Sequence, residues 1–277
     1  MLLRHSITTM LLTAAFLAAA GARAEDVSKY PDWKGQWVGI GAAEDAPWDP
    51  SKPAGLAQEA PLTPEYQKIY QATLARHASG IKDPTTCLPP GMPRTMIMYQ
   101  PMEIIVMPDT TYVMVTYMSE FRRIFTDGRK WPDEIEPSYA GYSIGHWVDE
   151  GNTGRYNVLE VETRALKGPR TFDGTGLPLH EDNETTVKER IYLDKKDLNL
   201  LHDEVTTTDH ALTHPWTVTR SYYREPNPVW NEFVCSEDNH QVMLGKENYL
   251  ISDQGYLSPT RPGQPPPDLK YFKPVAK

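Results

Sequence analysis

The fold of this chain is decided by the stretch TTVKERIYLDKKDLNLLHDEVTTT, residues 185–208. Apolar and polar side chains alternate on both sides of its centre, which is the period of a β-strand with one buried face. Between the two alternating runs, the residues from Asp194 to Asp197 are turn formers. The combination predicts an antiparallel hairpin that pairs Thr185–Leu193 with Asn199–Thr208.

The same two-residue period recurs from about residue 94 to residue 235, with turn signals between the runs and no helical pattern among them. Nine strands in sequential order favour one antiparallel meander, and closing it into a barrel removes its exposed edges. We therefore predict an all-β protein with an antiparallel barrel. The predicted strands are Met102–Met107, Thr111–Met118, Phe121–Thr126, Tyr142–Val148, Tyr156–Thr163, Thr185–Leu193, Asn199–Thr208, Trp216–Tyr223 and Glu232–Cys235.

One helix is predicted before the barrel, in LTPEYQKIYQATLARHASG. Thr63 caps it, Pro64 occupies its first position and Gly80 ends it. A short strand near the start of the chain places Trp33 and Trp37 on one face. Pro-rich segments flank these elements. The chain is accordingly divided into a signal peptide (1–24), a region with strand, Pro-rich segment and helix (25–93), the barrel (94–240) and an extended C-terminal tail (241–277).

The first residues predict export. Arg4 precedes the apolar run Thr9–Ala20, which leads to an Ala-x-Ala ending at Ala24. The run is shorter than the roughly 20 residues of a membrane span, so we expect a cleaved signal peptide and a periplasmic or secreted protein without membrane insertion. Cleavage would leave 26 Lys and Arg against 37 Asp and Glu. This formal charge of −11 argues against nucleic-acid partners, whereas a homodimer remains compatible with the sequence.

Two cysteines occur, Cys87 and Cys235. In an oxidising compartment a disulfide is favoured over two free buried thiols. The bond would close a loop of about 148 residues. In the chain-entropy model this stabilises the fold by about 4–5 kcal/mol.

The segment GYSIG, Gly141 to Gly145, matches the G-x-S-x-G pattern of the serine-hydrolase nucleophile elbow. That elbow joins a strand to a helix in a parallel sheet. Here a polar stretch with two prolines precedes Ser143, and a hairpin signal follows it. We interpret the segment as a strand, with Gly141, Ser143 and Gly145 on one face and Tyr142 and His146 on the other. The small residues leave room for a close approach by a backbone or a ligand.

Charged residues occur at strand positions that face the barrel interior. Of Arg122 and Arg123, one must point inward, where it needs a carboxylate or an anionic ligand. Glu103 and Glu189 lie among apolar residues and are its candidate partners. His146 also lies among apolar residues, and both a hydrogen-bonded core histidine and a catalytic base fit that position.

Seven of the eight methionines after the predicted signal peptide lie between Met92 and Met118. They would either line a cavity for a hydrophobic or aromatic ligand or form an adaptable core.

No metal or cofactor is predicted. His210 and His214, with Asp209 and His202 nearby, have a four-residue spacing that aligns two ligands only on a helix. Pro215 instead indicates a turn that enters a strand. The sequence contains no phosphate loop, dinucleotide fingerprint or haem-attachment motif.

Six segments in order resemble a family of exported, mostly uncharacterised bacterial proteins: CLPPGMPR, RRIFTDGR, PSYAGYSIGHW, VKERIYL, DHALTHPWTVTRSYYR and EFVCSEDN. The resemblance covers about residues 85–240, implies a lipocalin-like barrel and includes both cysteines. Val148 and Asp149 stand where the family has Glu-Gly, and His210 stands where it has Pro. A looser association is with the γ-formaldehyde lyases of lignin-degrading sphingomonads, because a barrel lined with Met, Tyr and Trp would suit phenylpropanoid dimers.

Two functions of different classes fit these observations. The first is a cofactor-independent lyase or isomerase that acts on a hydrophobic or aromatic small molecule inside the barrel. The second is an exported carrier that binds such a molecule unchanged. In the enzyme, His146 or an interior carboxylate would move a proton, and Arg122 or Arg129 would hold negative charge. The expected catalytic residues are His146, Arg122, Glu189, Asp127 and Arg129, and the expected substrate contacts are Tyr142, Glu103, Met114, Tyr117 and Trp147.

Overall fold

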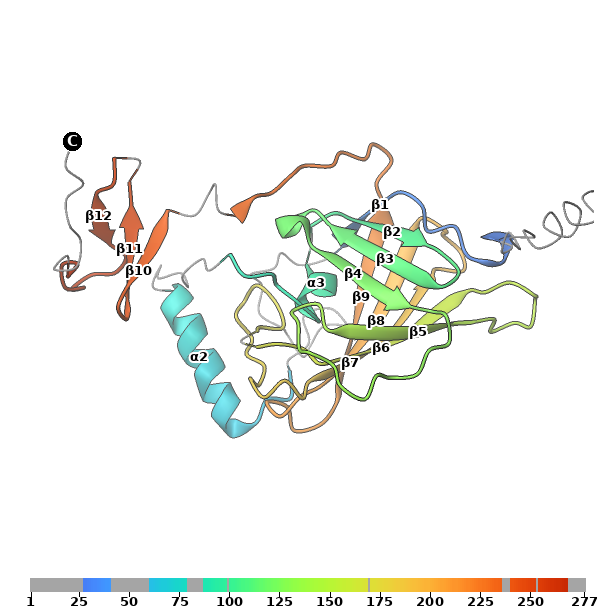
Figure 1. The fold of residues 1–277 in the computed structure, drawn as a ribbon, viewed down its shortest axis with the longest axis horizontal. Helices are drawn as coiled ribbons and strands as arrows, with labels where there is room; N and C mark the ends of the chain where they lie inside the picture. Colours follow the sequence, from blue (N-terminus) through green and yellow to red (C-terminus); the bar gives the residue numbers. More distant parts are fainter. Residues whose placement is uncertain are drawn as a thin grey trace, which may run out of the picture.

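The computed structural model describes residues 27–40, 60–78, 87–98, 100–168, 170–235, 240–252 and 254–268, and it confirms the all-β class (Figure 1). The predicted signal peptide lies outside these residues. Each barrel strand pairs with the next along the chain, and the last pairs with the first. The closed barrel consists of β1 (Gln36–Ile40), β2 (Met102–Val106), β3 (Thr110–Val115), β4 (Phe121–Phe125), β5 (Tyr142–Val148), β6 (Val158–Arg164), β7 (Thr186–Leu193), β8 (Leu200–Thr208) and β9 (Trp216–Arg224).

The predicted central hairpin is confirmed as β7 and β8, in register from Thr186 opposite Thr208 to Leu193 opposite Leu201. Burial alternates along both strands because successive side chains point to opposite faces. The hairpin therefore supplies one wall of the barrel core.

The barrel is not purely antiparallel, because β4 and β5 run parallel, with Ile124 opposite Ser143. The antiparallel prediction is therefore wrong for this pair. Directions must alternate around an antiparallel ring, and an odd number of strands cannot alternate all the way round. A ring of nine strands thus requires at least one parallel contact, and the connection 126–141 provides it by returning along the barrel.

The ninth strand of the barrel is β1, not the predicted strand Glu232–Cys235, so the barrel extends into the region 25–93. β1 pairs with β2 at Gln36 and Trp37 and with β9 from Trp37 to Ile40. The Trp37 side chain is fully buried, and its indole N–H donates to the Trp33 carbonyl at 3.0 Å. Burial of this large apolar side chain explains why the short strand completes the core.

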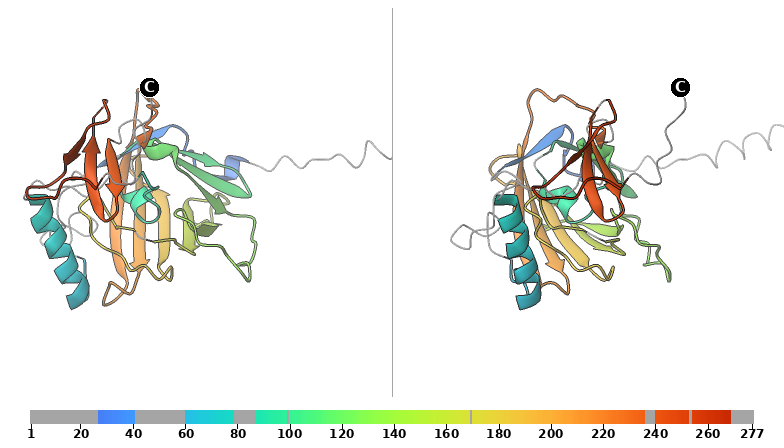
Figure 2. Two further views of the ribbon diagram at one scale, coloured as in Figure 1. Left: turned by 60° about the vertical axis from the view of Figure 1, so that its left-hand side comes forward. Right: turned by 90° about the vertical axis from the view of Figure 1, so that its left-hand side faces the viewer.

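The predicted helix is confirmed as α2 (Pro64–Ala78), which lies outside the barrel (Figure 1). Three short helical elements were not predicted: η1 (Val27–Lys29), α3 (Arg94–Ile97) and η2 (Tyr117–Ser119). α3 lies between the wall β7–β9 and the wall β2–β4 (Figure 2), and the Met96 carbonyl in it accepts a hydrogen bond from Tyr222. None of the helices in the described part of the chain is long and apolar enough to cross a membrane.

The clustered methionines divide between core and surface. Four of them are buried, as expected for methionines of an adaptable core: Met92, Met96, Met98 and Met102. Met107 is exposed and Met114 is half-buried on the outside of the barrel.

The C-terminal region differs from the predicted extended tail. It forms a separate three-stranded sheet from β10 (Gln241–Leu244), β11 (Glu247–Ile251) and β12 (Leu257–Pro259), near one end of α2 (Figures 1 and 2). Gly245, with φ +65°, makes the tight turn between the first two strands. Ahead of this sheet, Cys235 forms the predicted disulfide with Cys87.

Candidate functional site in the barrel interior

A layer of polar side chains crosses the barrel interior. It is built by inward positions on strands β4 to β9, each flanked along its strand by buried apolar or small residues. All its members are at most 6% exposed: Arg122, Ser143, Thr163, Glu189, Asp203, Thr207, Arg220 and Tyr222. Because buried polar groups are costly unless they are satisfied, such a layer points to function or to a specific structural network.

Arg122 is the centre of this layer. Its Nη1 donates to Glu189 Oε1 at 2.7 Å, and its Nη2 contacts Oε2 of the same carboxylate. Its Nε donates to Ser143 Oγ at 3.1 Å, and Nη2 also donates to Thr163 Oγ1 at 2.7 Å. The structure thus confirms that one arginine faces inward, and it selects Glu189 rather than Glu103 as the partner.

Ser143 has no nucleophile geometry. Its hydroxyl is 2.8 Å from the Thr163 hydroxyl and accepts from Arg122, and no described histidine or carboxylate makes a hydrogen bond to it. The small residues around it serve packing, because a Cβ on Gly145 would lie 2.8 Å from Ile124 Cγ2. The GYSIG segment is therefore a strand that allows close approach between neighbours.

Asp203 faces the same layer from β8 and was not predicted. It is fully buried, and neither carboxylate oxygen has a hydrogen-bond partner among the described residues. Burial raises the pKa of Asp203 well above its usual value, and the negative charge of Glu189 raises it further against the opposing effect of Arg122. Because an ionised Asp203 would repel the Glu189 carboxylate, Asp203 favours its protonated form. Glu189 and Asp203 are thus two buried acidic side chains of the same layer, and we refer to them as the carboxyl pair.

Two residues of β9 complete the layer. Arg220 lies directly across from Asp203 in the strand register, and its Nε has no hydrogen-bond partner in the described part of the chain. Tyr222 donates its hydroxyl to the Met96 carbonyl, and burial raises its pKa well above the usual value. At neutral pH the phenol is therefore a neutral donor.

His146 does not join the interior layer. Its side chain is 70% exposed on the outside of β5, and its Nε2 lies 2.8 Å from Glu160 Oε2. Period-two alternation fixes this position, because Ser143 and Gly145 point inward and the histidine has the opposite parity. His146, predicted to be a catalytic base or a hydrogen-bonded core residue, therefore lies outside the barrel interior.

Asp127, Arg129 and Tyr142 form a cluster on the outer surface. Arg129 donates to both oxygens of Asp127, with Nη2 at 2.6 Å from Oδ2, and its guanidinium lies 3.7 Å from the Phe125 ring centroid. Its Nη1 also donates to the Tyr142 hydroxyl at 3.3 Å. The hydrogen bonds from Arg129 lower the pKa of Asp127 to about 2. These contacts hold the connection between β4 and β5 against the outer face of the two strands. The cluster does not belong to the interior layer.

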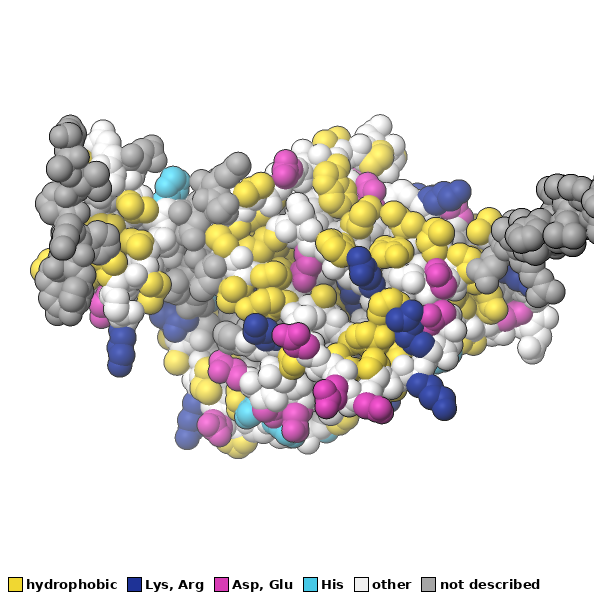
Figure 3. All heavy atoms as spheres, viewed as in Figure 1, with side chains coloured by type: hydrophobic (Ala, Val, Ile, Leu, Met, Phe, Trp, Pro, Cys, Tyr) yellow, Lys and Arg dark blue, Asp and Glu magenta, His cyan; other side chains and the backbone are white. Residues whose placement is uncertain are grey.

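The other predicted substrate contacts are dispersed. Glu103 and Met114 lie on the outer face of the barrel, where hydrophobic side chains cover the wall of β2–β4 (Figure 3). Tyr117 stacks on Phe233 with ring centroids 4.9 Å apart. Only Trp147 has inward parity, and it packs against Trp33 at 4.9 Å.

The sequence contained a sign of the unpredicted members of the layer, Asp203, Arg220 and Tyr222: each is a polar residue at an inward position of its strand. Asp203 lies between Leu201 and Val205 in the inward register of its strand, as Glu189 does on β7. A charged residue at an inward strand position is therefore a sequence signal for membership of the interior polar layer.

A separate cleft of about 890 Å³ lies outside the barrel, near the ends of β7 and β8. Its wall includes Tyr156, Arg190, Tyr192 and Leu198, but no member of the interior layer. It is a ligand-sized space without the buried carboxyl pair.

The chain matches no known protein-family model and no curated protein. The functional argument therefore rests on the geometry of the interior layer.

Proposed function

We propose that the protein is an exported, cofactor-independent lyase or isomerase that acts on a hydrophobic or aromatic small molecule inside the barrel. One observation carries the proposal: Glu189 and Asp203 form a fully buried carboxyl pair beside Arg122. Pairs of carboxyl groups whose environments separate their pKa values are typical of general acid–base catalysis.

The two carboxyl groups have different environments. Arg122 binds Glu189 through two nitrogens, and we assign Glu189 the role of general base. Asp203 has no such cation in hydrogen-bond contact and is the general acid. Arg122 would also stabilise negative charge that develops on a substrate oxygen.

Consider a substrate in which the carbon that carries a hydroxymethyl group is bonded to a second carbon, and this second carbon bears an oxygen leaving group. For such a substrate the pair supports a balanced fragmentation. Glu189 takes the hydroxyl proton, the carbon–carbon bond breaks and formaldehyde forms. The electron pair of the broken bond makes the new alkene, and Asp203 protonates the departing oxygen. Transfer of a proton from Glu189 to Asp203 restores the starting state. Phenylpropanoid dimers from lignin carry these groups.

A carrier is the second candidate, favoured by the outer cleft. Its wall combines Tyr156, Tyr192 and Leu198 with the guanidinium of Arg190, which suits an aromatic ligand with a polar end. Such a protein would bind its ligand at this cleft and leave it unchanged.

The test is turnover of a panel of γ-hydroxymethyl phenylpropanoid dimers, measured as formaldehyde and alkene released. We expect Asp203→Asn and Glu189→Gln to lower turnover by about 100-fold or more, the usual contribution of a general acid or base. His146→Gln, on the outer surface, is the matched control and should keep full activity. Full turnover by Asp203→Asn contradicts the proposal. Binding without conversion, lost in Tyr192→Ala, identifies the carrier instead.

A further inference from the structure

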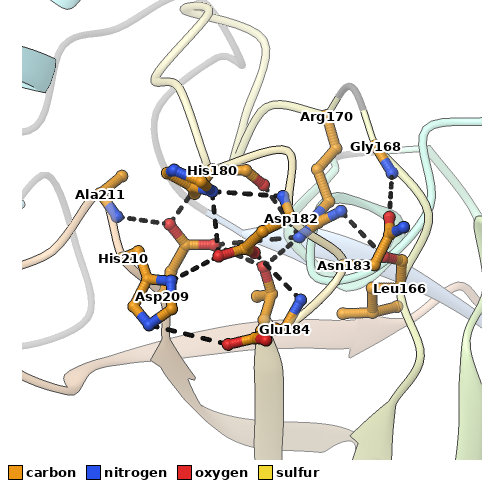
Figure 4. A network of polar contacts seen from close by, with 11 residues as sticks. Leu166, Gly168, Arg170, His180, Asp182, Asn183, Glu184, Asp209, His210 and Ala211 are labelled. Atoms are coloured by element: carbon orange, nitrogen blue, oxygen red, sulfur yellow. Dashed lines mark hydrogen bonds and ion pairs between the residues drawn. The ribbon is translucent and has the colours of Figure 1, made fainter.

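Two loops at one end of the barrel bring two imidazoles to one carboxylate (Figure 4). His180 and Asp182 lie in the connection between β6 and β7, and His210 lies in the connection between β8 and β9. One ligand atom from each of the three residues lies within 4.8 Å of the others. The histidine pair noted in the sequence, His210 and His214, does not include His180, because only the fold brings His180 close to His210.

The carboxylate of Asp182 is divided between two roles. Its Oδ1 accepts the backbone N–H of Glu184 at 3.0 Å, which fixes the orientation of the carboxylate. Its Oδ2 faces both imidazoles, 3.0 Å from His180 Nδ1 and in direct contact with His210 Nδ1. One oriented oxygen and two ring nitrogens thus converge on a common point.

The spacing of His180 and Asp182 fits two ligands of one metal ion. His180 Nδ1 lies 3.0 Å from Asp182 Oδ2, and ligand atoms around a zinc ion lie about 3–3.5 Å apart. Nδ1 also lies 3.2 Å from the backbone nitrogen of Asp182. Since Nδ1 has one lone pair, a bound metal would replace the hydrogen bond from that N–H.

A buried framework holds the two loops in place. Asp209 Oδ1 accepts the N–H of His180 at 2.9 Å and the N–H of Ala211 at 2.7 Å, so one carboxylate joins both histidine-bearing segments (Figure 4). Arg170 donates to the His180 carbonyl at 3.1 Å and lies 3.9 Å from Asp209 Oδ2. The side chains of Arg170 and Asp209 are at most 1% exposed. The backbone of His180 is thus fixed at both its N–H and its carbonyl, as in a preorganised site.

Glu184 adds negative charge beside the cluster. Its Oε2 lies 3.9 Å from His210 Nε2, the ring nitrogen that does not face Asp182, which is beyond hydrogen-bond distance. The carboxylate therefore favours a cation at the cluster through its charge and not as a ligand.

We propose that His180, Asp182 and His210 form a binding site for a divalent late first-row transition metal, with Zn²⁺ as the best match. Two imidazole nitrogens and one carboxylate oxygen are zinc ligands, whereas Mg²⁺ and Ca²⁺ prefer oxygen-only sites. His210 is 62% side-chain exposed, so water or a further ligand can reach the metal. The site does not depend on the proposed chemistry of the barrel interior.

The test is calorimetric titration of the metal-stripped full chain with Zn²⁺, and with Mg²⁺ for comparison. We expect one Zn²⁺ per chain, no response to Mg²⁺, and at least about 100-fold weaker Zn²⁺ binding in His180→Ala and His210→Ala because each removes one of three ligands. His214→Ala is the matched control, an exposed histidine on the same loop outside the cluster, and should bind Zn²⁺ as the unchanged protein does.

Three results overturn the proposal. The unchanged protein fails to bind one equivalent of Zn²⁺, which leaves only an Asp–His ion pair. His210→Ala binds as tightly as the unchanged protein, or His214→Ala loses as much affinity as His210→Ala. Far-ultraviolet circular dichroism of each variant verifies the fold. Since the readout is binding, failure here is distinct from failure of the dimer turnover assay.

Discussion

Replacement of Arg122 by methionine tests the interior layer most directly. The side chains of Arg122 and Glu189 are 1% and 0% exposed, and the guanidinium makes hydrogen bonds to Glu189, Ser143 and Thr163. Arg122→Met keeps much of the volume but leaves the Glu189 carboxylate buried beside Asp203 without its cation. Removal of one partner from a buried ion pair costs about 3–5 kcal/mol. For a domain of this size the melting temperature should fall by roughly 6–20 °C.

The measurement is urea unfolding followed by circular dichroism, with the disulfide intact. Arg123→Met is the matched control, because the neighbouring arginine is exposed on the outer face. Glu189→Met combined with Arg122→Met should recover more than half of the loss, since two apolar side chains replace the pair without a stranded charge. The reasoning is refuted if Arg122→Met destabilises no more than Arg123→Met, or if the losses of the two interior changes simply add.

Three further predictions concern stability. Because the pKa of Asp203 is raised, the folded protein keeps a proton that the unfolded chain releases above about pH 4, so stability falls as pH rises beyond that point. Asp203→Asn should remove this slope in urea titrations and be more stable than the unchanged protein at neutral pH; an unaltered slope contradicts it. Replacement of Cys87 and Cys235 by alanine should lower the free energy of unfolding by about 5 kcal/mol for a loop of 148 residues, and equal stability with and without the bond would exclude the loop-entropy argument. Gly145→Ala should cost about 1–3 kcal/mol, because its Cβ would lie 2.8 Å from Ile124; an unchanged melting temperature shows that the core can relax there.

Alternation of side chains made much of the barrel predictable. It located eight of the nine strands and required an inward arginine, which proved to be Arg122. It could not say which face of a given strand is inward. His146 and Ser143 have opposite parity on β5, and only the closed barrel shows that the serine side is buried. For the same reason, the sequence could not distinguish Glu103 from Glu189 as the partner of the inward arginine.

Contacts between loops that are distant in the chain could not be predicted from the sequence. His180 and His210 belong to different connections, and their approach depends on Asp209 accepting backbone hydrogen bonds from both. No periodicity relates such positions. β1 was assigned to a separate region because a five-residue strand followed by a Pro-rich segment offers no local sign that it pairs with β9.

The pairing of β1 with β9 has a consequence for biosynthesis. The first barrel strand to leave the ribosome, β1, hydrogen-bonds to the last barrel strand, with Trp37 opposite Arg224. Until β9 is made, the barrel has two open edges and the apolar face of Trp37 lacks its final partner. Ring closure must therefore be a late event, and a nascent chain stalled before residue 216 should be a substrate for chaperones that bind exposed strands.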